Sequence, residues 1–165
     1  MGELPQGRSI RAEPLQQALQ RASVSTTMAT DIQIPMWEKF LVLRWGVIGA
    51  VTRAPAEVIR TLPQVRAMVE QACEEVRAVA QARSIRMAAD TIERSMAILD
   101  SLPPSSTTSM QRDILERRPS ELDAQAGALV RLGQQSGVSI PLHMVLYHSL
   151  LPMELRARGD LSFPE

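Results

Sequence analysis

The chain has 165 residues, the length of one ordinary domain, which is enough to form a hydrophobic core. Its 18 basic and 18 acidic residues leave no formal net charge, whereas surfaces for nucleic acid or anionic membranes usually carry excess Lys and Arg. No run approaches the roughly 20 apolar residues of a membrane span, and the N-terminus lacks an apolar signal core. We therefore expect a cytoplasmic protein that binds neither nucleic acid nor membranes.

The first 34 residues differ in pattern from the rest of the chain. Residues 3–7 have turn chemistry, and residues 13–21 can form a short helix. Residues 24–34 alternate and are rich in β-branched side chains, which predicts a strand or an extended connection. Because these pieces cannot close a sheet alone, residues 1–34 are predicted to be the end of a larger α/β unit.

From Pro35 the pattern is helical, and we predict a bundle of about six helices over residues 35–152. Gly137 is predicted to end the fifth helix, and Pro152 to end the last one, leaving residues 153–165 as a frayed tail. The six helices are predicted over the following residues: 35–48, 61–83, 89–100, from 108 or 109 onward, 119–135 and 141–151.

Three residue types limit the chemistry. The single cysteine, Cys73, lies on an apolar helical pattern and is predicted to be a buried, inert thiol. His143 and His148 are five positions apart rather than the four of a helical metal pair, so we expect no metal site. The charges of Glu74 and Glu75 fit a solvated helix face, and we assign them no chemistry.

Residues 109–127 form the candidate site, because they gather hydroxyls, carboxylates, a basic pair and a glycine around a helix start. Within them, Ser109 and Glu121 stand at predicted helix starts, where helix capping for Ser109 and first-turn charge for Glu121 account for their positions. Lys39, the only lysine, lies in a mostly apolar helix, where a surface lysine with a buried stem is the alternative to a functional role.

The order and spacing of these residues resemble those of ketopantoate reductases (2-dehydropantoate 2-reductases). Each motif is weak alone, but together they cover nearly the whole chain. The matching residues are Trp37 and Lys39; Ser109, Met110 and Asp113; Ser120, Glu121, Leu122, Asp123 and Gly127; and Gly137 and Pro141.

The resemblance implies a helical C-terminal domain like that of 6-phosphogluconate dehydrogenase over residues 35–152. It also implies that residues 1–34 are the remnant of the end of an N-terminal Rossmann domain, most of which is absent. No G-x-G-x-x-G motif is present, so we expect NADPH to be bound by that missing domain and not by this chain alone. The family reduces a 2-keto acid, 2-dehydropantoate, for pantothenate and coenzyme A synthesis. The resemblance assigns proton donation to Lys39, the substrate carboxylate to Ser109 and the substrate hydroxyl to Glu121. It also implies a homodimer.

Some positions depart from the family pattern. Leu43, Val47 and Ala126 stand where the family commonly has asparagine, and two of these asparagines orient the polar groups of the substrate. A more apolar pocket could take a different 2-keto acid or none. The alternative is therefore a helical dimerisation or interaction module that has lost catalysis.

Overall fold

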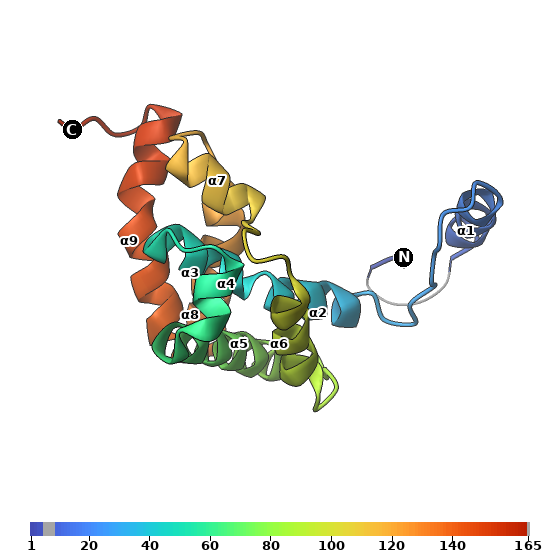
Figure 1. Ribbon diagram of the computed structural model, residues 1–165. Helices are drawn as coiled ribbons and strands as arrows, with labels where there is room; N and C mark the ends of the chain where they lie inside the picture. Colours follow the sequence, from blue (N-terminus) through green and yellow to red (C-terminus); the bar gives the residue numbers. More distant parts are fainter. Residues whose placement is uncertain (5–8, 165) are drawn as a thin grey trace. The chain divides into compact units, whose positions relative to one another are not determined.

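The computed structural model describes residues 1–4 and 9–164 (Figure 1). The chain forms two compact units, Met1–Lys39 and Phe40–Glu165, and each is described by itself. The regular structure of the described residues is helical, without β-strands, which confirms the predicted mainly helical class. Within these residues, no helix combines the length and the apolar character needed to cross a membrane.

The first unit contains α1 (Ala12–Arg21) and the beginning of α2 (Gln33–Val42). Between the two helices the chain is an extended connection rather than a strand. The Met1 ammonium donates to the carbonyl oxygen of Thr27 over 2.6 Å. The Asp31 carboxylate accepts from the backbone N–H of Gln33 at 2.9 Å and so caps the start of α2. Most of the predicted turn at residues 3–7 lies outside the described residues.

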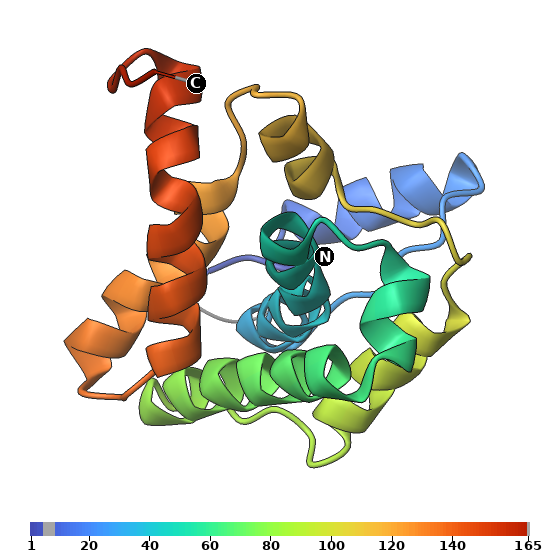
Figure 2. The same ribbon diagram turned by 60° about the vertical axis from the view of Figure 1, so that its left-hand side comes forward.

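The second unit is built around α3 (Arg44–Thr52), in which the seven residues from Arg44 to Ala50 are buried. The predicted helix over 35–48 is therefore wrong in one respect: it is two helices, α2 and α3, separated at Leu43. Figure 2 shows α3 at the centre of this unit. The helices that pack against α3 are α4 (Ala56–Thr61), α5 (Pro63–Ala82), α7 (Ser109–Leu115) and α9 (Pro141–Arg158).

The remaining helical elements follow the predicted order. Gly137 adopts a left-handed φ of +66° and ends α8 (Ala128–Ser136) as predicted. Cys73 is fully buried in α5, which confirms the predicted burial, and burial raises the pKa of its thiol to about 11, which disfavours the reactive thiolate. The elements not yet placed are α6 (Thr91–Ser101) and the π-helical turn η1 (Asp123–Gly127).

The prediction that Glu75 lies on a solvated face is wrong. Glu75 is 7% exposed, and its carboxylate accepts from the backbone N–H groups of Leu142 and His143 at 2.8 and 2.9 Å. The Nδ1 atom of His143 lies 2.6 Å from the same carboxylate. Burial alone would raise the pKa of Glu75, but these hydrogen bonds lower it, while burial lowers the pKa of His143. A neutral His143 therefore donates to an ionised Glu75, which anchors the start of α9 on α5.

We expect Glu75→Gln to lower the free energy of unfolding by about 2 kcal/mol, because a buried amide cannot satisfy all three donors. The Glu75 contribution is present above the ordinary glutamate pKa of 4.5 and is lost as the pH falls through the lowered folded value. Urea denaturation should therefore show that the difference between wild type and variant shrinks as the solution is acidified. The neighbouring exposed Glu74, paired with Arg77, provides the control: Glu74→Gln should change stability by no more than about 0.5 kcal/mol. Equal effects of the two substitutions would contradict the anchoring role.

The predicted end of the last helix at Pro152 is also wrong, because α9 continues through this proline to Arg158. A proline inside a helix removes one hydrogen bond and costs about 3 kcal/mol. Two residues that follow this proline, Glu154 and Arg158, form hydrogen bonds with Ser120, which belongs to a distant segment of the chain. These contacts offset the cost of the proline and hold the helical conformation of the last turns.

Candidate functional site

The three predicted site residues fall in different units. Lys39 is exposed in the last turn of α2 and ends the first unit, whereas Ser109 and Glu121 belong to the second. Both of the latter side chains are exposed. No hydrogen bond between described residues joins Ser109 to Glu121. The roles of the three residues stay predictions.

Ser109 is the first residue of α7, but it does not cap the helix. The cap is Thr108, whose side-chain oxygen accepts from the backbone N–H of Gln111 at 3.2 Å. The hydroxyl of Ser109 makes no hydrogen bond to any described residue. The capping alternative for Ser109 is therefore wrong, and its hydroxyl is available to a ligand.

The start of α7 is held in place by close packing on α3. A Cβ atom at Gly46 would lie 2.7 Å from the Thr108 side chain, so only glycine permits this approach. Gln111 is buried, and its amide donates to the carbonyl oxygen of Ala54 at 2.9 Å. Thr108 and Gln111 are thus fixed by α3 and by the loop that follows it. Because Ser109 lies between these two residues, its hydroxyl has a rigid support.

Glu121 follows a buried hydrogen-bonded corner. The Glu154 carboxylate, 2% exposed, accepts from the backbone N–H of Ser120 at 3.0 and 3.1 Å and from its hydroxyl at 2.5 Å. The Ser120 hydroxyl oxygen in turn accepts from the backbone N–H of Leu122 at 3.1 Å. The Glu121 carboxylate accepts only from the Gln125 side chain among the described residues, at 2.8 Å. Its neighbours are thus fixed while its carboxylate stays exposed.

A π-helical turn, η1, comes directly after this corner, and sequence analysis did not predict it. Such turns occur frequently at functional sites. The Asp123 carboxylate in this turn accepts from Arg131 and from the Tyr147 hydroxyl, each at 2.8 Å. The hydrogen bond from Arg131, and then that from Tyr147, lowers the pKa of Asp123. A Cβ atom at Gly127 would lie 2.5 Å from this carboxylate and 3.0 Å from the Tyr147 ring, which explains the glycine.

Arg44, which was not predicted to be a functional residue, is fully buried at the start of α3. Its Nε atom donates to the carbonyl oxygen of Phe40 at 2.8 Å, and its guanidinium lies 3.9 Å from the centre of the Phe40 ring. Burial lowers the pKa of Arg44 to about 10, so it remains charged at neutral pH. The only sequence signal was an arginine inside an apolar run.

Two of the three apolar departures from the family pattern lie at the start of α3 and inside it. Leu43 immediately precedes α3 and is half-buried, and Val47, inside α3, is 1% exposed. Neither side chain can orient a polar group by hydrogen bonding.

Comparison with known proteins identifies the family. Residues 31–154 match the family described as ketopantoate reductase PanE/ApbA C terminal. Among curated relatives, the 2-dehydropantoate 2-reductase of Vibrio cholerae is 26% identical over 87% of this chain and 49% of its own length. The enzyme of the same name from Nostoc is 27% identical over 94% of this chain and 49% of its own.

Solved structures give the same result for the fold. The 2-dehydropantoate 2-reductase of Methylococcus capsulatus matches with a TM-score of 0.84 at 27% identity, over 94% of this chain and 50% of its own. A D-mandelate dehydrogenase bound to NADH and anilino(oxo)acetate also has a TM-score of 0.84, but at 19% identity it supports the fold alone. The chain spans about half the length of the curated relatives it matches. It belongs to the ketopantoate reductase family and corresponds to the C-terminal domain of these proteins.

Proposed function

We propose that this chain is the substrate-binding and dimerisation half of an NADPH-dependent reductase that converts a 2-keto acid to the 2-hydroxy acid. The observation that carries the proposal is the family match over residues 31–154, with relatives that are named 2-dehydropantoate 2-reductases. Pantothenate and coenzyme A synthesis is the corresponding role for 2-dehydropantoate as substrate.

The proposed chemistry divides among three side chains. The Lys39 ammonium gives a proton to the carbonyl oxygen and stabilises the charge that develops on it. The Ser109 hydroxyl, left without a partner among the described residues, donates to the substrate carboxylate. The exposed Glu121 carboxylate accepts from a substrate hydroxyl.

The residues present do not fit a dinucleotide site. The sequence has no G-x-G-x-x-G, and the described residues contain no strand from which a phosphate-binding strand–turn–helix could be built. The cofactor would therefore be held by a separate N-terminal domain, as the coverage of the relatives suggests.

The substrate is proposed to be more apolar than 2-dehydropantoate. Leu43 and Val47 supply no hydrogen bond at the two positions where the family orients polar substrate groups. A pocket built to bond a hydroxyl rejects analogues that lack it, whereas an apolar pocket does not. We therefore favour 2-keto acids with an alkyl side chain.

A chimera that joins residues 31–165 to the N-terminal half of the Nostoc reductase tests the proposal. We expect the chimera to oxidise NADPH with 2-keto-3-methylbutanoate at a kcat/KM about tenfold above that with 2-dehydropantoate. Leu43→Asn should shift this ratio toward 2-dehydropantoate. The isolated chain, mixed with NADPH, is the control, and we expect it to show no turnover. A folded chimera that reduces no 2-keto acid would contradict the reductase assignment and favour a non-catalytic interaction module.

Dimerisation belongs to the same proposal. A dimeric ketopantoate reductase from Staphylococcus aureus shares the fold, with a TM-score of 0.83 at 23% identity. In the present chain, α9 exposes Met144 and Val145, the latter 64% exposed. Large apolar side chains on a helix surface are typical of protein interfaces. A homodimer that covers this part of α9 is the proposed assembly.

A further inference from the structure

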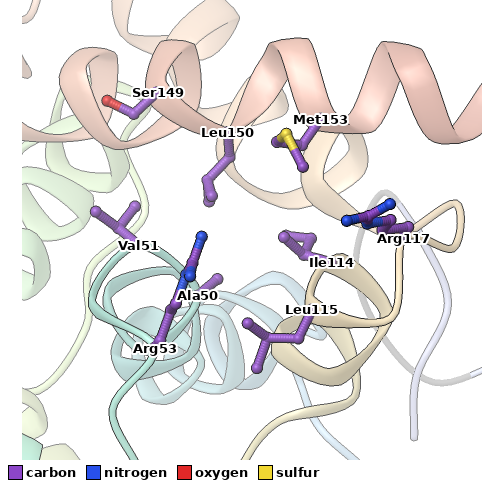
Figure 3. A pocket seen from close by; sticks show the side chains of 9 residues that line it. All are labelled: Ala50, Val51, Arg53, Ile114, Leu115, Arg117, Ser149, Leu150 and Met153. Carbon is purple, nitrogen blue, oxygen red and sulfur yellow. The ribbon is translucent and has the colours of Figure 1, made fainter. Parts of the chain in front are cut away.

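A pocket of about 410 Å³ lies in the second unit, at the end of α7 opposite Ser109 (Figure 3). Its walls are the C-terminal ends of α3 and α7 and the middle of α9. The side chains of Ile114, Leu150 and Met153 give it an apolar floor. The volume is within the range of about 300–1,000 Å³ that is usual for small-molecule sites.

Two arginines, Arg53 and Arg117, line this pocket, and Figure 3 shows them on either side of Ile114. None of the nine lining residues carries a carboxylate. The Arg53 side chain makes no hydrogen bond or ion pair with any described residue. The pocket thus combines an apolar floor with a positive rim.

The backbone gives a second, independent sign that these arginines have a role. Both have a left-handed φ of 59°, a conformation in which glycine is the default and a side chain costs free energy. Arginine is favourable near the C-terminal end of a helix for electrostatic reasons. An arginine one residue earlier, inside the helix, would gain the same electrostatic stabilisation without a left-handed backbone. Two strained arginines on one pocket therefore call for a different explanation.

We propose that this pocket binds a small amphipathic carboxylate, with the anion between Arg53 and Arg117 and an alkyl body on the apolar floor. Guanidinium groups form charge-assisted hydrogen bonds with carboxylates. The Ser149 side chain, on α9, also lines the pocket. Three of its lining residues, Ile114, Leu115 and Arg117, belong to the candidate stretch at residues 109–127, but the pocket lies at the opposite end of α7 from Ser109.

Titration of the full chain with octanoate, followed by calorimetry and NMR shifts, tests the proposal. We expect saturable binding that is weakened about tenfold by Arg53→Gly and by Arg117→Gly, the loss of one charge-assisted contact. Glycine suits the left-handed backbone, so both variants should melt no lower than wild type. The matched control is Ser84→Gly, at another left-handed residue (φ 63°) outside this pocket, which should leave octanoate binding unchanged.

Three results would overturn the proposal. The first is the absence of saturable octanoate binding, and the second is equal binding of uncharged octanol, which would leave only an apolar hollow. The third is full affinity in the double variant Arg53→Gly/Arg117→Gly. In that case the arginines serve only the ends of α3 and α7.

Discussion

Replacement of Lys39 by methionine should lower kcat/KM of the chimeric reductase by about 10²- to 10⁴-fold, the usual contribution of a positioned general acid. Methionine preserves the length and the apolar stem of the side chain, but it can neither give up a proton nor stabilise a developing alkoxide. Because Lys39 is exposed in the last turn of α2, the loss of its charge should leave the fold intact. Stopped-flow NADPH oxidation, together with thermal denaturation, separates the catalytic effect from a structural one.

Lys39→Arg is the sharper variant. Its guanidinium keeps the positive charge but does not release a proton in proteins. We therefore expect a KM near that of the unsubstituted chimera with a kcat that falls nearly as far as in Lys39→Met. If Lys39→Met retains more than about a tenth of the activity, Lys39 does not donate the proton.

The helices and helix ends that were predicted correctly are those determined by their own residues and not by distant contacts. The apolar positions of α5 recur at helical spacing, and Gly137 ends α8 because a left-handed residue is needed there. The start of α7 was placed correctly for the same reason. Its capping residue was not, because Thr108 and Ser109 are chemically similar neighbours and only the backbone decides between them.

Long-range contacts explain what could not be predicted. Glu74 and Glu75 look alike in the sequence, yet one turns toward solvent and the other meets donors 67 and 68 positions away. In the π-helical turn, Asp123 accepts a hydrogen bond from Tyr147, 24 positions later. For the candidate site, Ser109 and Glu121 came from the family resemblance, and the structure adds what fixes their neighbours. No sequence pattern predicted that Ser120 would form hydrogen bonds with Glu154 and Arg158.

Glu154→Ala should lower the free energy of unfolding by about 3 kcal/mol, the largest stability effect that we expect. The substitution leaves the backbone N–H and hydroxyl of Ser120 without their buried acceptor, and it removes the carboxylate that Arg158 contacts at 2.7 Å. It also releases the last turns of α9, which continue beyond Pro152 with the support of these bonds. Chemical denaturation should show the loss, and amide exchange should rise both after Pro152 and around Glu121.

Two further variants make this expectation specific. Glu154→Gln keeps one carbonyl acceptor for Ser120 and should cost about 1–2 kcal/mol, less than the alanine variant. Glu116→Ala removes an exposed carboxylate that pairs with Arg118 and should cost less than about 1 kcal/mol, as surface ion pairs usually do. If Glu154→Ala and Glu116→Ala destabilise equally, the corner at Ser120 does not hold α9. If exchange rises only after Pro152, the same corner does not support the segment that carries Glu121.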